Sequence, residues 1–278
     1  MKKYIVLLLL LLCIPVFVLK ESEEKKPKAK PVLRIGAECD YVPNSWEEYK
    51  PSDSNVPIAN LEGYYAEGYD IQIARIVAEE LGMTLEVRKF AWNDLLPALN
   101  RGEIDAVFSS MLDTPERKLI ADFSDPYEVE PTEYAMIVDS VSPYITAKSL
   151  RDFSGAKIIG ERGTKLDEVI VQIPGAVHMK PMENLQGVIE AVLNGDADGA
   201  VIETDTGHYY ELINKKLTMI RFPENEGFKL GFTGVCAGVK KGNTELLNKI
   251  NIVLGKIPRS ERRKIMDTAN SRMMTNLR

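Results

Sequence analysis

LNRGEIDAVFSS (residues 99–110) and LNGDADGAVIE (residues 193–203) repeat one pattern at two distant places in the chain. Each segment contains the end of a helix-like run, a glycine that stops it, an aspartate (Asp105 or Asp198) and an apolar run typical of a buried strand. The repeat predicts two α/β units that are built alike.

Polar residues follow both apolar runs at the same distance. Counting five positions on from each aspartate gives Ser110 in the first unit and Glu203 in the second. Both therefore lie just past the carboxyl end of a strand, the edge at which open α/β sheets bind ligands. Two such edges that face each other form a cleft between domains, a common place for small-molecule sites. Such echoes also arise in unrelated α/β proteins, but the matching polar exits favour the cleft.

Strand-like and helix-like runs alternate on the N-terminal side of the first repeat. The runs are strands at 32–37, 84–90 and 104–109 and helices at 69–81 and 94–100, with Gly82 and Gly102 after the helices. Alternation of this kind, with nearly continuous apolar strands, indicates parallel sheets that are covered on both faces. The predicted fold class is α/β.

The segment SSMLDTPERK (residues 109–118) leaves the first repeat and starts a helix. Thr114 is a good N-cap, and Pro115 suits the first helical position. Arg117 in the first turn opposes the helix macrodipole unless an anion is bound beside it. A solvated surface arginine is the simpler alternative, but an anion-binding site explains the position better.

The composition describes a soluble globular protein and argues against several functions. The chain has 278 residues, 45% of them hydrophobic, and a formal net charge of −6, without a basic patch interleaved with aromatic residues. Nucleic acid is therefore not an expected partner. With two histidines and no HExxH, Ser-His-Asp or paired-cysteine motif, the sequence predicts no catalytic centre, metal site or cofactor. The distant Cys39 and Cys236 fit either one disulfide or, more commonly, two small buried hydrophobic side chains.

The N-terminus has the pattern of an export signal. Two lysines precede an uncharged apolar run, so residues 1–19 are expected to be a signal or membrane anchor. Cys13 raises acylation as an alternative, which the large Leu12 before it disfavours. Residues 20–31 are too highly charged to fold and predict a tether. Each version places the rest of the chain outside the cytoplasm, tethered to a membrane.

Several segments, in order along the chain, resemble the extracytoplasmic solute-binding proteins of amino-acid ABC importers. They are GYDIQIARIVAEELGMTLEV (68–87), LLPALNRGEIDAVFSSMLDTPERK (95–118), DFSDPY (122–127), GERGTKLDEVI (160–170), GDADGAVIE (195–203) and GFTGVCAGVKKGN (231–243). The resemblance implies a monomer that captures a free amino acid and delivers it to the permease subunits of an ABC importer.

The resemblance also implies a periplasmic-binding-protein-like fold of type II. In that fold two α/β domains with mixed, mostly parallel sheets are joined by two crossing hinge strands and close on the ligand. The first domain would take in residues 32–138 and 234–278, and the second residues 139–233. The crossings are expected near 137–142 and 229–234.

Four residues are expected, from the resemblance, around the carboxylate of the amino acid. Arg117 would hold it through two parallel N–H bonds, a geometry that lysine cannot match. Leu112 would add its backbone N–H, at a position where the family usually has Ser or Thr. Thr164 and Lys165 open a helix in the second domain and would contribute their N–H groups. The ammonium of Lys165 is expected to point into solvent.

Five further residues would meet the rest of the ligand. Glu203 and Ser110 would receive its ammonium group. Tyr41 and Tyr69 fall where the family stacks aromatic rings on the ligand side chain, although Tyr69 also fits the core face of a helix. Glu38 would face the far end of that side chain, and three more residues are expected nearby: Asp40, Asp113 and Trp46.

An acidic pocket with aromatic walls predicts a basic or polar amino acid, arginine or histidine before lysine. An aromatic or apolar ligand is the alternative. Two other functions also stay open. Some proteins of this fold are enzymes, such as cyclohexadienyl-acid dehydratases that keep the carboxylate-binding arginine, and a ligand-sensing module is the second possibility.

Overall fold

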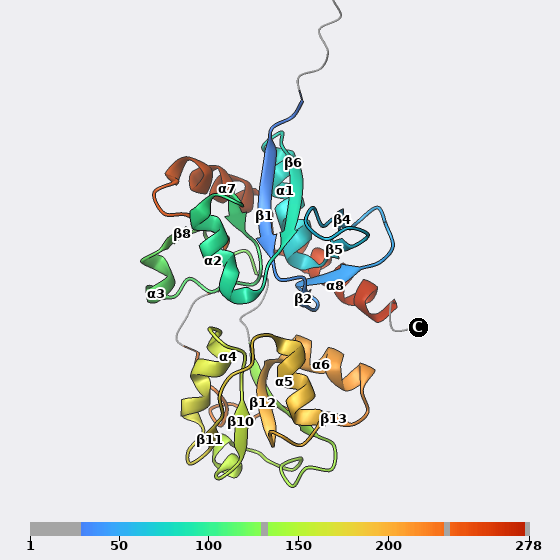
Figure 1. The fold of residues 1–278 in the computed structure, drawn as a ribbon, viewed down its shortest axis with the longest axis vertical. Helices are drawn as coiled ribbons and strands as arrows, with labels where there is room; N and C mark the ends of the chain where they lie inside the picture. The colour runs from blue at the N-terminus through green and yellow to red at the C-terminus, as the bar shows by residue number, and fades with distance from the viewer. Residues whose placement is uncertain (1–28, 129–132, 231–233, 276–278) are drawn as a thin grey trace, which may run out of the picture.

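The computed structural model describes residues 29–128, 133–230 and 234–275, which form two lobes (Figure 1). The first lobe contains both ends of the described chain, and the second lies between them in sequence. In these three ranges no helix is long and apolar enough to cross a bilayer. The predicted signal at 1–19 and nearly all of the predicted tether at 20–31 lie outside the described residues.

The first lobe is built on a five-stranded sheet in the order β6-β1-β7-β14-β8. β1 pairs in parallel with β6 and β7, whereas β14 is antiparallel to β7 and β8. These strands are β1 (Val32–Ala37), β6 (Thr84–Lys89), β7 (Ala106–Val107), β8 (Ala121–Phe123) and β14 (Gly238–Lys240). A small antiparallel sheet in the order β2-β3-β5-β4 follows β1 in sequence. Its strands are β2 (Asp40–Tyr41), β3 (Ser45–Glu48), β4 (Val56–Pro57) and β5 (Tyr65–Glu67).

Helices cover both faces of the five-stranded sheet, as the alternation of the sequence predicts. One apolar cluster combines the sheet with α1 (Tyr69–Glu80), α7 (Thr244–Lys256) and α8 (Arg259–Thr275). A second cluster combines it with α2 (Trp92–Arg101). β7 contributes Ala106 to the first cluster and Val107 to the second, because successive strand residues face opposite sides. The single turn α3 (Pro115–Lys118) follows β7.

The second lobe repeats this design on a sheet in the order β11-β10-β12-β9-β13. β10 is parallel to β11 and β12, and β9 is antiparallel to β12 and β13. The strands are β9 (Tyr134–Asp139), β10 (Lys157–Ile159), β11 (Val177–His178), β12 (Gly199–Glu203) and β13 (Leu217–Ile220). Its helices are α4 (Lys165–Glu168), α5 (Leu185–Leu193) and α6 (Thr204–Ile213), with 3-10 turns at Leu150–Phe153 and Val169–Gln172.

β9 corrects the predicted position of the first hinge crossing. The sequence predicted a crossing near 137–142 and the start of the second domain at residue 139. Instead, Tyr134–Asp139 is an interior strand of the second sheet, paired with both β12 and β13. A short apolar run has the same pattern in a crossing segment and in a buried strand, so the sequence alone did not separate the two. The second predicted crossing, 229–234, falls largely on residues outside the described ranges.

The other predicted elements lie close to the observed ones. The strand at 32–37 is confirmed, and the helices predicted at 69–81 and 94–100 begin and end within two residues of α1 and α2. The strand predicted at 104–109 is reduced to Ala106–Val107. Thr114 caps α3, since its Oγ1 accepts from the backbone N–H of Arg117 at 3.3 Å. Cys39 and Cys236 are both buried and unbonded, which confirms the commoner alternative.

The repeated aspartates have the same role in both lobes. Asp105 Oδ2 accepts from the backbone N–H of Arg34 at 2.9 Å, and Asp198 Oδ2 accepts from that of Lys157 at 2.7 Å. The N–H of each aspartate donates in return to the carbonyl of the same partner, at 2.7 Å and 2.8 Å. Each aspartate therefore fixes β7 or β12 in register against its parallel neighbour, β1 or β10.

We expect Asp105→Ala to lower the free energy of unfolding by about 1–3 kcal/mol, because it leaves the backbone N–H of Arg34 without its acceptor and removes an ion pair. Asp198→Ala removes the equivalent acceptor in the second lobe and should also destabilise the protein. The control is Asp196→Ala, at an exposed position, which should change stability by less than about 0.5 kcal/mol. Urea denaturation measures all three. Equal stability of the Asp105 and Asp196 variants would contradict the role of the repeat.

Candidate functional site

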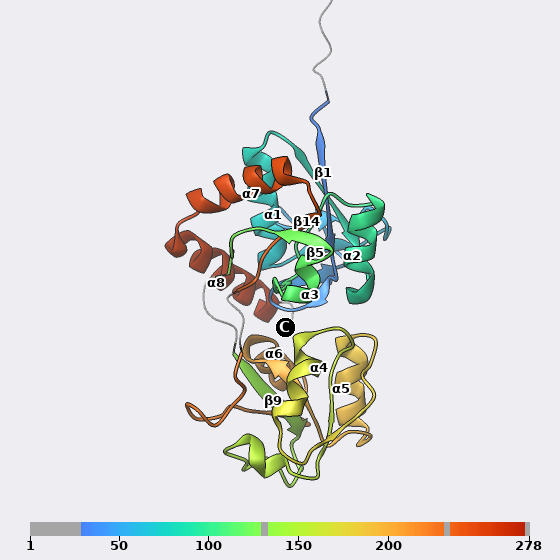
Figure 2. The same ribbon diagram turned by 90° about the vertical axis from the view of Figure 1, so that its left-hand side faces the viewer.

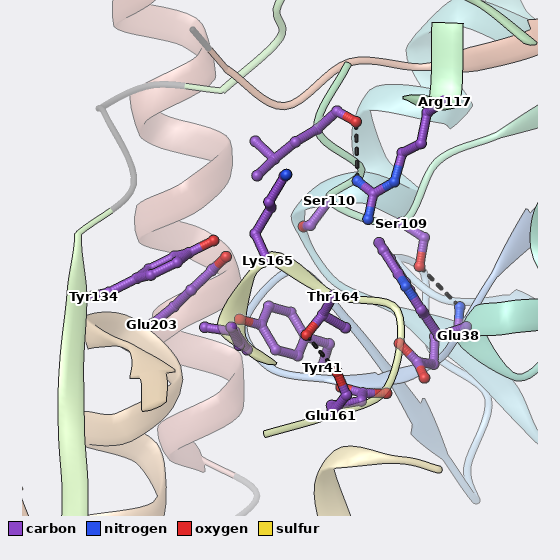
Figure 3. Close-up of a pocket in the computed structure, with 13 residues that line it drawn as sticks. Glu38, Tyr41, Ser109, Ser110, Arg117, Tyr134, Glu161, Thr164, Lys165 and Glu203 are labelled. Carbon is purple, nitrogen blue, oxygen red and sulfur yellow. Dashed lines mark hydrogen bonds between the residues drawn. The ribbon is translucent and has the colours of Figure 1, made fainter. Parts of the chain in front are cut away.

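A pocket of about 420 Å³ lies between the lobes, and thirteen residues line it (Figure 3). The first lobe contributes residues that follow β1 and β7 and residues of α2 and α3. The second lobe contributes residues that follow β10, those at the start of α4, and the ends of β9 and β12 that face the first lobe. The pocket is thus built at the carboxyl edges of parallel strands from both sheets, as the repeat predicts.

Two serines at the exit of β7 position other parts of the site. The hydroxyl of Ser109 accepts from the backbone N–H of Glu38 at 3.1 Å, which joins the exits of β1 and β7. The hydroxyl of Ser110 donates to buried Asp70 at 3.0 Å. Ser110 has a φ of 49°, in the left-handed region that non-glycine residues rarely adopt. The chain therefore turns sharply here, next to the pocket.

Arg117 supplies a fixed positive charge at one end of the pocket. Its Nη1 donates to the carbonyl of Leu112 at 2.9 Å, and its Nη2 donates to the carbonyl of Gly163 at 3.1 Å. The guanidinium carbon lies 5.0 Å from the ring centroid of Trp92, within cation–π range. Burial lowers the pKa of Arg117, which stays far above neutrality. These contacts fix the position of the guanidinium, and its remaining N–H groups can meet an anion.

Trp92, Asn93 and Arg117 connect the two lobes through one loop, the turn that precedes α4. Trp92 Nε1 donates to the carbonyl of Gly163 at 2.9 Å, the same oxygen that accepts from Arg117. Asn93 Nδ2 donates to the carbonyl of Arg162 at 3.3 Å. The lobes are therefore in direct contact along this side of the pocket.

Tyr41 connects the lobes on the other side. It follows β1 in sequence, yet its ring packs within an apolar cluster of the second lobe, beside residues of β9 and α5. Nearby, Thr206 Oγ1 of α6 donates to the carbonyl of Val42 at 2.7 Å, a buried bond between the lobes. The arrangement is a closed one, with contacts on both sides of the pocket.

Glu203 provides a carboxyl group at a second point of the pocket, beside Tyr41 and Tyr134 (Figure 3). Burial raises the pKa of Glu203 to about 8, and the nearby Tyr41 hydroxyl opposes that rise. Asp70, just beyond Ser110, has its pKa raised to about 7 by burial, against the hydrogen bonds from Tyr127 and Ser110. An ammonium group placed here would favour the ionised form of Glu203.

Glu38 and Glu161 form the third polar point, one from each lobe (Figure 3). Only 4% of Glu38 and 2% of Glu161 are exposed to solvent. The Oε1 atoms of both side chains are buried without a hydrogen-bond partner, as is Oδ1 of neighbouring Asp40. Burial raises the pKa of Glu38 well above its usual range and that of Glu161 to about 7. This end of the pocket is acidic and lacks hydrogen-bond donors for those oxygens.

Eight of the nine predicted site residues lie together in the pocket: Glu38, Tyr41, Ser110, Leu112, Arg117, Thr164, Lys165 and Glu203. Lys165 lines the pocket rather than extending into solvent, and its ammonium pairs with Glu168. The backbone N–H of Thr164 donates to the carbonyl of Glu161 at 3.2 Å. That N–H is therefore already used within the turn, contrary to the expectation that it binds the carboxylate.

Tyr69 is the exception among the predicted site residues. It is buried in the first-lobe core, its hydroxyl donates to the backbone carbonyl of Tyr127, and it does not line the pocket. Two residues expected near the distal end are also elsewhere. Trp46 is buried and donates to Glu48, and Asp113 pairs with Lys118 at 2.6 Å. Tyr69 and Trp46 follow the usual preference of large aromatic side chains for the core.

The sequence reasoning missed five lining residues: Trp92, Ser109, Tyr134, Glu161 and Leu166. A signal for Glu161 was present. Glu38 lies four positions after Arg34, and Glu161 lies four positions after Lys157, the two residues to which the repeated aspartates bind. Extending the repeat to β1 and β10 would have paired the two glutamates.

The pocket between two similar α/β lobes, with charged groups of both signs at its strand edges, agrees with the comparison to known families. The sequence profile of the bacterial extracellular solute-binding proteins, family 3, matches residues 33–269. The chain belongs to this family. Its place in the family puts the folded part of the chain outside the cytoplasm and confirms the resemblance found in the sequence.

Three similar proteins illustrate the family. The arginine-binding extracellular protein ArtP of Bacillus subtilis (strain 168) is 29% identical over 259 residues, which cover 91% of this chain and 92% of ArtP. The structure of an ancestral arginine-binding protein bound to arginine is 26% identical with a TM-score of 0.70, covering 87% of this chain and 99% of that one. An ancestral amino-acid-binding protein, AncCDT-1, described as a precursor of cyclohexadienyl dehydratase, is 26% identical with a TM-score of 0.69, covering 85% and 94%.

In the part of the chain that the structure describes, no group of three or more His, Cys, Asp or Glu side chains is placed to hold a metal ion. The chemistry available at the pocket is therefore that of fixed charges and hydrogen bonds. These groups can bind an ion that carries both signs of charge.

The buried acids of this site should make the ligand-free protein less stable as the pH rises. Because their folded pKa values are raised, their contribution is fully present below about pH 4, the unfolded range of carboxyl groups, and is lost as the pH rises through about 7 to 8. We expect the Tm of the ligand-free protein to fall by about 3 °C or more between pH 5.5 and 8.5. Differential scanning calorimetry checks this.

Glu203→Gln is the matched variant, since it keeps the uncharged shape and removes the titration. Its Tm should depend less on pH than that of the unmodified protein over the same range. A Tm that stays level or rises toward pH 8.5 in both proteins would contradict the raised pKa values.

Proposed function

We propose that this protein captures a free amino acid with a cationic side chain in the pocket between its lobes and delivers it to the permease of an ABC importer. The observation that carries the proposal is the pattern of charge in one closed pocket: Arg117 at one end, Glu203 at a second point, and the pair Glu38 and Glu161 at a third. A basic amino acid has one anionic and two cationic groups, which match these three points in sign.

The α-carboxylate would bind to Arg117 and to the backbone N–H of Leu112. Burying that carboxylate without a counter-charge would cost several kcal/mol, and an arginine held by fixed contacts supplies the charge in two parallel bonds. The α-ammonium would lie between Glu203 and the carbonyl of Ser110. Lys165 and Thr164 would close the pocket from the second lobe.

The ligand side chain would extend toward Glu38 and Glu161. Their unpartnered Oε1 atoms are acceptors that a guanidinium, an imidazolium or an ammonium can satisfy. The rings of Tyr41 and Trp92 line the space between. A planar cation can stack on such rings and also form hydrogen bonds, so arginine or histidine is expected before lysine. The printed names of the arginine-binding relatives support the same ligand class.

The N-terminal segment completes the proposal. Its apolar run and charged linker support a chain that is exported and then held at the membrane, by an uncleaved anchor or by acylation at Cys13. Tethering of this kind would keep a monomeric binding protein close to its permease. A second candidate function, dehydration of a cyclohexadienyl acid, is favoured only by the similarity to AncCDT-1.

A panel of the twenty amino acids, measured by thermal shift and then by calorimetry, tests the function. Binding of a basic amino acid should raise the Tm, since a ligand that binds only the folded state stabilises it. The ligand should be recovered unchanged, and prephenate-like acids should give no product. A stronger Tm increase with tryptophan or leucine than with arginine and histidine would overturn the ligand class, and turnover of the cyclic acid would favour the enzyme.

Arg117→Ala should weaken amino-acid binding by more than a hundredfold, about 3–5 kcal/mol, because the carboxylate loses its counter-charge in a buried place. Arg117→Lys should recover only part of this, since a lysine cannot form the two parallel bonds. Arg162→Ala is the control: this neighbouring arginine pairs with exposed Glu183, and its loss should leave affinity nearly unchanged. A loss of less than tenfold in Arg117→Ala, with the fold intact by circular dichroism, would place the carboxylate elsewhere.

A further inference from the structure

Glu38 and Glu161 are paired across the closed cleft in a way that bears on protonation. They follow equivalent strands, β1 and β10, and reach the same end of the pocket from opposite lobes (Figure 3). The two carboxyl groups are close enough that each acts on the other as a hydrogen-bond partner. Such a bond needs a proton on one of them, because two ionised carboxylates are both acceptors.

The groups around the pair do not neutralise it. Asp40, from β2, is a further acid and acts on both carboxyl groups. From α6, the Tyr210 phenol faces Glu161 and Asp40, and burial keeps it protonated. From β6, Lys89 lies near Asp40 but forms its ion pair with Glu47 at 2.7 Å.

The positive groups of the pocket itself are engaged elsewhere. Arg117 donates to the carbonyls of Leu112 and Gly163, and Lys165 pairs with Glu168. Two negative charges buried side by side without a cation repel each other and lose their hydration, so one proton is retained. The raised pKa of both carboxyl groups, due mainly to burial, agrees with this.

We propose that Glu38 and Glu161 form a carboxyl pair that shares one proton in the empty pocket and releases it to solvent when a cationic side chain binds, so that capture of a basic amino acid depends on pH. The inference rests on the proposed function and adds to it. The cation replaces the proton as the group that bridges the two lobes. Below the apparent pKa of the pair, a basic ligand competes with that proton, and a neutral ligand does not.

L-Arginine and L-citrulline separate this effect from the rest of the site. They share the α-carboxylate and α-ammonium, so any proton that Glu203 releases is common to both, and they differ in the charge of the side chain. Calorimetry on the wild-type protein, in two buffers of different ionisation enthalpy at each half unit from pH 5.5 to 8, counts the protons released. Arginine should release up to one proton more than citrulline at the acidic end. The ratio of the two affinities should then rise about tenfold per pH unit until the pair is ionised.

Glu161→Gln tests whether the second carboxyl group is the cause. With an amide beside it, Glu38 should ionise at lower pH, so the extra proton and the slope of the affinity ratio should largely disappear while arginine still binds. Glu183→Gln, at an exposed carboxylate farther along the chain, should keep the wild-type profile. Thermal unfolding confirms that each variant is folded.

An equal proton count for arginine and citrulline in the wild-type protein, at every pH, would overturn the proton coupling and leave the proposed function intact. A wild-type profile in Glu161→Gln would assign the proton to another group and would overturn the pair. If Glu161→Gln fails to fold, the wild-type proton count alone decides. Absence of binding by any amino acid in the earlier panel would instead refute the function itself, and the coupling with it.

Discussion

Charges buried between two lobes are stable only where fixed groups of opposite sign meet them, and the rest of this structure follows from that constraint. Arg117 is held by two backbone carbonyls and the face of Trp92, none of which neutralises its charge. Glu203, Glu38 and Glu161 are held by burial, which raises the pKa of each. The empty pocket therefore keeps its ionic groups in unfavourable surroundings, and a ligand of matching charges relieves them. Stability of the ligand-free protein is reduced in favour of affinity.

The site is also the product of a repeated unit. Asp105 and Asp198 make the same bonds to Arg34 and Lys157, so each lobe presents two strand exits at fixed spacing. Ser110 and Glu203 occupy one pair of exits, and Glu38 and Glu161 the other. Facing copies of one design can contribute equal groups, as at the glutamates, or different groups, as at the serine and glutamate. The first choice makes a symmetric carboxyl pair, and the second gives the pocket its direction.

Much of this was accessible from the sequence, because it depended on local pattern. Glycine stops, the N-cap Thr114 and apolar periodicity are local signals, and they predicted most elements and eight lining residues. What failed needed partners far along the chain. The strand Tyr134–Asp139 has the composition of a crossing segment, and only pairing with β12 and β13 places it. Tyr69 lies on a helix whose buried face turns toward the core, and the role of Trp92 depends on a loop seventy-one residues away.

Tyr41 has one more consequence, for temperature. Its ring is carried by the first lobe but packs in an apolar cluster of the second, so any motion that separates the lobes must withdraw it into water. Stabilisation by apolar burial weakens on cooling and carries a large heat-capacity change. Closure of this cleft is therefore coupled to heat capacity: part of the force that holds the lobes together is thermal in character, and cold favours the open form.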